Sequence, residues 1–244
     1  MRKGWTWEDI RFLILLFLAL AALLALNIFL ARTLPGGEWL SVRWNGARAF
    51  MFEGVEPYSA AVAERAQSLV YGRTASVSEY GYVLNDPFYI VLLYAPLAVF
   101  SDFSIARGIW MLFAEAALVG TVLLTLRLLE WQAPRWALIC LVAFSLFGYY
   151  SLLPLISASP AIFFTFIYIS VLLALRSFND ELVGGLLVLL IYQWEVGALF
   201  FLFIVILVVA NKRWAVLTGF GMTLFVLLAV SFLMKPDWFL PYIR

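Results

Sequence analysis

An apolar run near the N-terminus constrains what this chain can fold into. Residues 12–31 hold no charged side chain, and Asn27 is their only polar interruption. Twenty helical residues are enough to cross a hydrocarbon core of about 30 Å. Across the chain 65% of residues are hydrophobic and only 13% are charged, so the sequence predicts an all-α polytopic membrane protein.

The same run has to be weighed against a secretory signal peptide, because Arg2, Lys3 and Arg11 precede it. A signal peptide has a shorter apolar core and a small-x-small cleavage site, and neither fits here. An uncleaved anchor is therefore the preferred interpretation of residues 12–31.

Further apolar segments follow, separated by turn residues or charges, and no soluble domain is visible. These segments are residues 87–100, 105–126, 136–153, 160–175, 182–192, 196–210 and 214–234. We therefore expect residues 1–244 to form one transmembrane domain of about seven to eight helices, with the remaining spans in 87–234 and a long polar loop, 32–86, that carries surface helices.

The distribution of basic residues predicts an orientation in the plasma membrane. A cytoplasmic N-terminus places loop 32–86 outside the cytoplasm, and the positive-inside rule then places the later basic clusters inside. Those clusters are Arg127 with Arg135, Arg176, and Lys212 with Arg213. This path requires an odd number of crossings between residues 87 and 127. A broken or re-entrant segment 87–100, with Pro87 and Pro96, is preferred over two ordinary crossings.

Two further expectations follow from this path. Tryptophans should form interfacial belts, with Trp7, Trp131, Trp136 and Trp214 near the inner face and Trp39, Trp44, Trp194 and Trp238 near the outer face. Polar residues should converge at the outer face: Glu38, the turn 157–160 and the break at residues 193–195.

Composition excludes several kinds of chemistry. The chain has no histidine, and Cys140 is its only cysteine, so neither a disulfide framework nor a thiol metal cluster is expected. Acid–base chemistry must therefore use carboxylates, tyrosines or lysines. A net charge of +1 without a basic face gives no indication of nucleic-acid binding.

The stretch 39–52 has the pattern of an amphipathic helix on a membrane surface. Leu40, Trp44, Ala47 and Met51 recur along one face, while Arg43 and Arg48 lie off it. The two arginines then either snorkel to lipid headgroups or bind a ligand. Gly36 and Gly37 permit a tight turn before the helix, so Glu38 is either a charge at its start or a functional carboxylate.

Three segments together resemble the N-terminal part of the polyprenyl-phosphate-sugar-dependent glycosyltransferases of the GT-C fold, in particular glycosyltransferase family 87. They read GGEWLSVRWNGARAFMFEGVEPYS, NDPFYIVLLYAPLAVF and SIARGIWMLFAEAAL. The resemblance covers roughly residues 33–115 and, more weakly, 181–238. It implies a GT-C-like bundle in which Glu38 stands where the family has a catalytic aspartate.

The resemblance also implies a reaction and its participants. A sugar such as mannose passes from a polyprenyl-phosphate donor to a glycan or lipid acceptor, with Glu38 as the base and membrane lipid as the surroundings. No resident cofactor is implied, no metal-binding residue is assigned, and a requirement for a divalent metal is left open. Five residues are the candidates for substrate binding: Arg43, Arg48, Tyr58 of the Gly-x-x-Pro-Tyr turn, Gln193 and Glu195.

The sequence departs from the family at two points. Glu38 replaces the aspartate, and Tyr192-Gln193-Trp194-Glu195 replaces a Lys-Pro-Gln motif. The chain also ends at Arg244, where family members continue through further spans, which suggests a truncated relative or an isolated module.

Other features keep two alternatives open, a transporter or lipid-binding protein and a non-catalytic membrane subunit. Glu115 lies in the middle of an apolar segment, where a charge is costly and has either a structural partner or a role in proton transfer. Gly184-Gly185 and Gly219-x-Gly221 more simply predict close helix packing.

Overall fold

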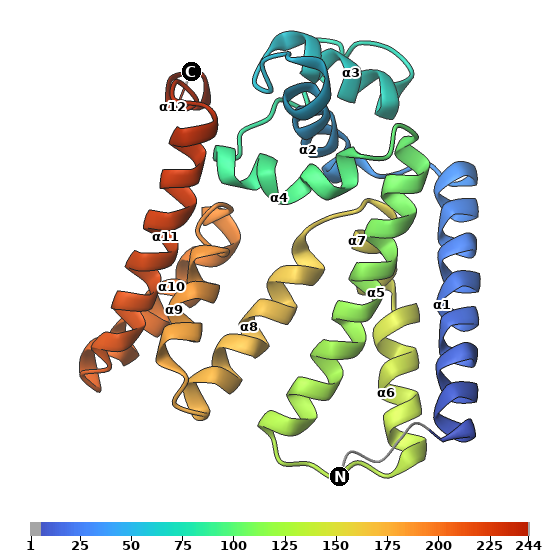
Figure 1. Cartoon of the computed structure of the whole chain (residues 1–244), viewed down its shortest axis with the longest axis vertical. Helices are drawn as coiled ribbons and strands as arrows, with labels where there is room; N and C mark the ends of the chain where they lie inside the picture. Colours follow the sequence, from blue (N-terminus) through green and yellow to red (C-terminus); the bar gives the residue numbers. More distant parts are fainter. Residues whose placement is uncertain (1–5, 244) are drawn as a thin grey trace.

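The computed structural model describes residues 6–243 as an all-helical chain, so the expected fold class is confirmed at that level. The helices are α1 (Trp7–Thr33), α2 (Glu38–Arg48), a π-helical turn (Ala49–Glu53), α3 (Ala60–Tyr71), α4 (Phe88–Ala98), α5 (Phe103–Leu128), α6 (Arg135–Phe147), α7 (Tyr149–Ile156), α8 (Ala161–Arg176), α9 (Asp180–Val188), α10 (Trp194–Ala210), α11 (Trp214–Met234) and α12 (Phe239–Tyr242). Figure 1 shows α2, α3 and α4 gathered at one end of the molecule, above the longer helices.

The number of helices that can span a membrane is smaller than the seven to eight predicted. By length and composition α1, α5 and α11 qualify, and α6 with α7 makes a fourth if this pair, bent by 45°, is one span. The apolar segments 160–175 and 182–192 yield only shorter helices, α8 and α9. Gly148 interrupts the segment 136–153, because its extended backbone ends α6 before α7 begins.

Helix α4 is the segment for which a broken or re-entrant path was preferred. It has eleven residues and does not run with the longer helices but lies across their upper ends (Figure 1). Most of its side chains are buried, but the internal Pro96 is exposed, so protein covers this helix only in part. Between residues 87 and 127, only α5 is long and apolar enough to qualify as a membrane span.

The basic clusters of the loops lie together at the end opposite α2–α4, which Figure 1 shows at the bottom. Ion pairs join the loops there: Arg176 pairs with Glu130, and Arg213 pairs with Asp180. Arg11 lies in the first turns of α1 at the same end, whereas Arg2 and Lys3 lie outside the described residues. The loops that carry the predicted cytoplasmic basic residues thus lie at one end of the molecule.

The tryptophans differ between the two ends. At the basic end the indoles are exposed, with Trp7 at 76% and Trp136 at 70%. At the other end Trp39 and Trp194 are exposed, but Trp44 and Trp238 are only 6% and 3% exposed and belong to a hydrophobic core. The prediction of an outer belt is therefore wrong for these two residues, because α4 and the C-terminal turn cover them.

Close backbone approach accounts for part of the helix packing, as the glycine pattern predicted. Helices α9 and α11 lie against each other, and a Cβ atom on Gly184 would come within 2.2 Å of the Val216 carbonyl oxygen. A Cβ on Gly219 would lie 2.6 Å from the Glu181 carbonyl oxygen. Gly221 has open space instead, so the pattern holds for one glycine of that pair.

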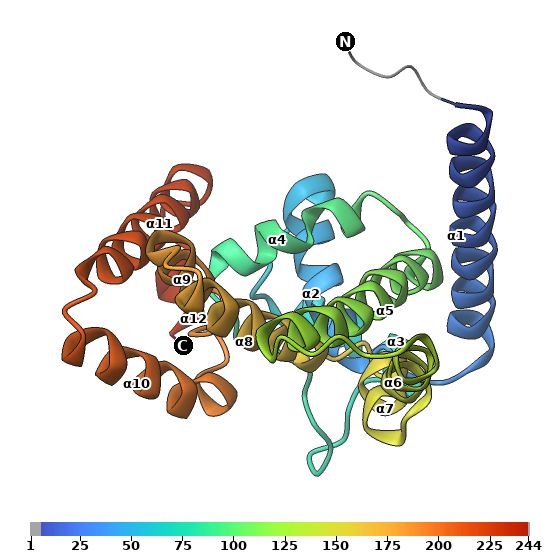
Figure 2. The ribbon, with the colours of Figure 1, turned by 90° about the horizontal axis from the view of Figure 1, so that it is seen from below.

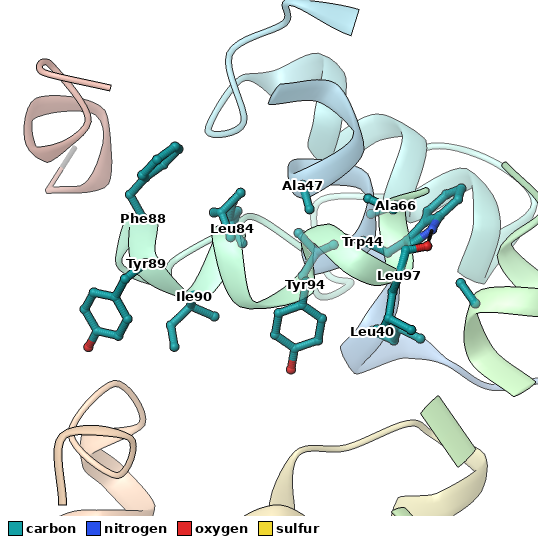
Figure 3. Packing of buried hydrophobic residues seen from close by; sticks show 14 of the residues in the cluster. Leu40, Trp44, Ala47, Ala66, Leu84, Phe88, Tyr89, Ile90, Tyr94 and Leu97 are labelled. Atoms are coloured by element: carbon teal, nitrogen blue, oxygen red, sulfur yellow. Dashed lines mark hydrogen bonds between the residues drawn. The ribbon is translucent and has the colours of Figure 1, made fainter. Parts of the chain in front are cut away.

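The main core lies between α2 and α4. Leu40, Trp44 and Ala47, three of the four residues of the predicted apolar stripe, are buried there, while Met51 is 42% exposed. Figure 3 shows Trp44 beside Leu97, and the indole Nε1 donates a hydrogen bond to the Leu97 carbonyl oxygen at 3.2 Å. The helix predicted in 39–53 is thus present, but α3 and α4 cover it, so its polar face is not open to solvent.

Candidate functional site

The turn before α2 requires glycine at two successive positions. Gly36 has φ +135° and Gly37 has φ +84°, a region that other residues rarely adopt. A Cβ on Gly36 would lie 2.5 Å from Arg107 Nη2, so any side chain at position 36 would also clash with Arg107. The turn makes Glu38 the first residue of α2, as the sequence indicated.

Arg107 of α5 holds this turn in place and was not singled out from the sequence. Its guanidinium group donates hydrogen bonds to four carbonyl oxygens, those of Ala31, Leu34, Pro35 and Ile156, at 2.7–3.2 Å. Only 3% of the residue is exposed. The end of α1, the glycine turn and the end of α7 therefore meet at one side chain.

The turn after α7 closes onto the start of α2. The amide of Gly37 donates to the Ile156 carbonyl oxygen at 3.0 Å, and the amide of Trp39 donates to the Ser157 carbonyl oxygen at 3.2 Å. The predicted convergence of Glu38 with the turn 157–160 is therefore confirmed. Two free amides at the start of α2 are satisfied in this way.

A cavity of about 490 Å³ opens beside Glu38. Its walls come from α2, the loop before α4, and the end of α7: Glu38, Trp39, Tyr80, Tyr82, Leu153, Pro154, Ser157 and Ser159. One carboxylate oxygen of Glu38, Oε2, is enclosed and has no hydrogen-bond partner. Enclosed polar atoms are nearly always hydrogen-bonded, so this oxygen is the strongest single indication of a ligand site.

Arg43 lies one turn further along α2 and shares a smaller cavity, about 50 Å³, with Glu38. Its Nε is 2.7 Å from Asp86 Oδ2, an ion pair without a well-directed hydrogen bond, and its Nη2 donates to Oδ1 at 3.1 Å. Burial is the largest single influence and opposes the charged form, but the charge and hydrogen bond of Asp86, together with Tyr94 and Tyr192, raise the pKa of Arg43. Arg43 is therefore a buried, paired cation, not a side chain extended to lipid headgroups.

Two other predicted binding residues have structural partners. Arg48 donates to the Ala98 carbonyl oxygen at 3.2 Å and lies 3.4 Å from a carboxylate oxygen of Glu53. Tyr58 donates to the Asp86 carbonyl oxygen at 3.0 Å, and burial raises the pKa of its phenol above the ordinary value. Neither residue lines the cavity beside Glu38.

The break after α9 is where the sequence placed it, but its polar residues do not reach Glu38. Helix α10 begins at Trp194 with Gln193 as its N-terminal cap position, and Glu195 is exposed. Tyr192 is the residue of this break that approaches the site, with its ring 6.0 Å from the Arg43 guanidinium carbon. Gln193 and Glu195 line none of the cavities described above.

An apolar groove of about 360 Å³ lies on the other side of Arg43. Tyr94 and Tyr192 line it, and each ring centre is 6.0 Å from the Arg43 guanidinium carbon. The rest of its wall is apolar or aromatic: Leu93, Pro96, Leu97, Trp110, Phe113, Pro160, Phe163, Phe164, Ile167 and Leu189. Figure 3 shows Tyr94 pointing from α4 away from Ala47 of α2, so this groove lies below the α2–α4 layer.

Glu115 has a structural partner. Asn27 of α1 donates a hydrogen bond from Nδ2 to Glu115 Oε2 at 2.9 Å. This contact links α1 to α5, and neither residue lines the cavity beside Glu38. It favours the structural interpretation of Glu115 over a role in proton transfer.

Comparisons of the chain with protein-family models, curated proteins and solved structures found no match. The resemblance to the GT-C glycosyltransferases therefore rests on the segments of sequence that carry it. Among residues 6–243 no group of three or more carboxylate, histidine or cysteine side chains is placed to bind a metal ion.

Sequence reasoning missed four residues around the site: Tyr80, Tyr82, Asp86 and Arg107. Asp86 and Arg107 lay within quoted segments, but nothing in the sequence pairs Asp86 with Arg43 or directs Arg107 to the glycine turn. A signal for the tyrosines did exist, because Tyr80-Gly-Tyr82 is an aromatic pair in an otherwise polar loop.

Proposed function

We propose that this protein is a membrane glycosyltransferase of the GT-C type that uses a sugar on a polyprenyl phosphate as donor. The observation that carries the proposal is the enclosed, unpartnered carboxylate oxygen of Glu38 at the wall of a 490 Å³ cavity. An apolar groove lies close by, separated from the Glu38 side by Arg43. A reaction between a lipid-linked sugar and a polar acceptor needs both surroundings.

Glu38 acts as the general base in this proposal. It removes the proton from an acceptor hydroxyl group while that oxygen forms a bond to the anomeric carbon of the donor sugar. The bond from that carbon to the phosphate oxygen breaks, and the lipid phosphate leaves with the electron pair. A positioned base of this kind typically contributes 10²- to 10⁴-fold to the rate.

Arg43, and not Arg48, is the cation assigned to the donor phosphate. Arg43 lines the small cavity together with Glu38, whereas Arg48 is bound to Glu53 and to the end of α4. A charged hydrogen-bond donor beside the leaving oxygen stabilises the charge that develops there. Asp86 keeps Arg43 charged and oriented until the phosphate arrives.

The same proposal assigns an orientation and a path through the membrane. Helices α2–α4 lie on the extracytoplasmic side of the plasma membrane, and the basic clusters lie on the cytoplasmic side. By length, only α1, α5, α11 and the bent pair α6–α7 qualify as spans, so this path requires the shorter helices α8, α9 and α10 to connect the two faces between them, with α4 at the outer interface.

The direct test measures transfer of radiolabelled sugar from polyprenyl phosphates in membranes that contain the protein. Glu38→Gln is expected to fold and bind donor but to lose at least about 100-fold in turnover. Glu38→Asp, the residue that the resemblance implies, is expected to retain or raise activity. Equal turnover in all three proteins would remove Glu38 from the mechanism and favour a non-catalytic membrane subunit.

The orientation has its own test. Val77 is fully exposed on the loop before α4, so Val77→Cys in a Cys140→Ser background is expected to react with an impermeant thiol reagent added to intact cells. Glu130→Cys in the same background, at the basic end, should react only after the cells are opened. The reverse pattern would overturn the orientation and, with it, the lipid-linked donor.

A further inference from the structure

The cavity beside Glu38 has an aromatic wall whose side chains are partly exposed. Trp39 is 43% exposed and Tyr80 is 60% exposed, and their ring centres are 6.5 Å apart. Tyr82 continues the wall, 5.0 Å from Tyr80 between ring centres in an edge-to-face arrangement. Large exposed aromatic side chains in a concave, partly polar site are typical of ligand recognition.

The loop that carries Tyr80 and Tyr82 is held firmly. Arg73 donates two hydrogen bonds to Glu79, each 2.7 Å long, and the amide of Ser76 donates to the same carboxylate at 2.8 Å. Gln67 of α3 donates to the Gly81 carbonyl oxygen at 2.6 Å and accepts from the Ala75 amide at 2.8 Å. The aromatic wall is therefore preorganised, which lowers the entropy lost on binding.

Unfavourable backbone geometry occurs at both sides of the cavity. Tyr82 has φ +43°, and Ala158, in the turn between Ser157 and Ser159, has φ +52°. Residues other than glycine adopt such values at a cost, and they are often found at functional sites. Both segments that carry these residues contribute side chains to the cavity.

The chemistry of the wall selects the class of ligand. No lysine or arginine is among the eight residues that line the cavity, and its one charge is the Glu38 carboxylate, so a phosphate or another anion does not fit. The serine hydroxyl groups of Ser157 and Ser159 and the Glu38 carboxylate suit a ligand with several hydroxyl groups. The aromatic faces suit a ring with an apolar side of C–H groups. A pyranose combines both features.

We infer that this cavity binds a pyranose ring of an uncharged saccharide against Trp39 and Tyr80, with a hydroxyl group directed to Glu38. The binding of a saccharide is independent of the proposed function. The role of that saccharide as the acceptor rests on the proposed function. The apolar groove is left for the lipid of the donor, because its wall offers almost no polar group.

The experiment measures binding by saturation-transfer NMR on the full chain in lipid nanodiscs. The probes are methyl α-mannopyranoside, methyl α-glucopyranoside, maltose and cellobiose, with cyclohexanol as an apolar control. We expect at least one saccharide to bind through its C–H face and cyclohexanol not to compete. Absence of binding by all four saccharides to the folded protein would overturn the inference.

Substitutions of Tyr80 test the stacked ring itself. Tyr80→Phe keeps the ring and should bind as the wild type does, whereas Tyr80→Leu keeps an apolar side chain and should bind about tenfold more weakly. Trp136→Leu, which removes an exposed aromatic side chain at the opposite end, should leave binding unchanged. The circular dichroism spectrum and melting temperature identify any variant that fails to fold. Equal binding by Tyr80→Phe and Tyr80→Leu would contradict stacking on Tyr80.

Failure of this inference and failure of the proposed function give different results. If saccharides bind through Tyr80 but no polyprenyl-phosphate sugar serves as donor, the site stands and the glycosyltransferase proposal falls. If sugar is transferred but Tyr80→Leu leaves the acceptor KM unchanged, the proposed function stands and this inference falls.

Discussion

The layer formed by α2–α4 and the bundle formed by the helices below it are held together by different interactions. Most of the buried polar and charged residues belong to the layer or its junction with α5: Ser41, Arg43, Asn45, Asp86 and Arg107. The bundle contributes only Asn27 and Ser231 to that set, and its helices approach through small residues such as Gly184. Figure 2, turned by 90°, shows α1 and the pair α10–α11 at opposite edges of this bundle.

The difference follows from the solvent that each region meets. Lipid is as apolar as a leucine side chain, so helices within a membrane gain little from apolar burial and associate through close van der Waals contact. The layer has a polar surface and an apolar core, as a soluble domain has, and it can hold a buried ion pair. The candidate site lies where these two regions meet, which is what the proposed lipid-linked reaction requires.

The largest loss of stability is expected from breaking the buried ion pair of the layer. Arg43→Ala leaves Asp86 without its partner and should lower the free energy of unfolding by about 3–5 kcal/mol. Arg176→Ala, which breaks an exposed pair at the basic end, should cost about 0–1 kcal/mol. Unfolding titrations in mixed micelles measure both.

The double variant Arg43→Met with Asp86→Leu separates charge from packing. Removing both charges should recover a large part of the stability, because no carboxylate is then left buried and unpaired. If Arg43→Ala lowered the free energy of unfolding as little as Arg176→Ala does, the buried ion pair of the layer would contribute no more to stability than the exposed pair at the basic end.

The next effect concerns the backbone contact between α9 and α11. Gly184→Ala would place a methyl group 2.2 Å from the Val216 carbonyl oxygen and 2.3 Å from the Phe220 amide nitrogen, atoms that cannot move independently of α11. We expect a loss of about 1–3 kcal/mol in the same titration.

Gly221→Ala provides the matched control in α11. A Cβ at Gly221 meets nothing within 4 Å, and alanine favours the helix by up to about 1 kcal/mol. Equal stability of the Gly184 and Gly221 variants would show that the close packing of α9 and α11 does not depend on a small residue at position 184.

A smaller effect is expected from the polar contact within the bundle. Asn27→Leu removes the donor to Glu115 and should lower stability by about 1 kcal/mol, the size typical of hydrogen bonds between membrane helices. Glu115→Gln keeps an acceptor for Asn27 and should be nearly neutral. If Glu115→Gln instead abolished sugar transfer without loss of stability, Glu115 would have a functional role.

The smallest effect is expected at the exposed loop 72–82. The hydrogen bonds from Arg73 and from the Ser76 amide lower the pKa of Glu79 from 4.5 to about 2. Because the pKa of Glu79 is lowered in the folded loop, its ionised carboxylate orders the loop fully at neutral pH. This contribution is lost as the pH falls from about 4.5 towards 2 and the carboxylate is protonated. The protection factors for amide hydrogen exchange in residues 72–82, which correct for the intrinsic pH dependence of exchange, should therefore fall over that interval, without global unfolding.

Glu79→Gln should raise exchange in this loop at neutral pH as well and leave the melting temperature unchanged. Glu64→Gln, on the exposed face of α3, is the control and should leave exchange in the loop unaltered. Protection factors in the loop that stay constant between pH 4.5 and 2 would remove Glu79 as its anchor.

The sequence predicted those parts of the fold and site that depend on local pattern. The apolar run 12–31 lies within α1, and the glycine pair places Glu38 at the start of α2. The preferred path through the membrane placed Glu38 and the turn 157–160 at one end, where their segments share hydrogen bonds. The number of spans was overestimated, because an apolar segment does not reveal where its helix ends, as the break at Gly148 shows.

By itself, the sequence determined an apolar helical chain with most of its charges outside the apolar segments, because hydropathy and glycine act locally. Only the tertiary structure decided what each polar side chain contacts. Arg43 pairs with Asp86, which is 43 residues away, and Arg107 reaches Leu34 and Pro35, which are 73 and 72 residues before it. Tyr80 stands beside Glu38 because the loop before α4 folds back onto α2. Such contacts depend on how elements that are far apart in the sequence pack together. The periodicity of residues within one element does not predict which other element it will contact.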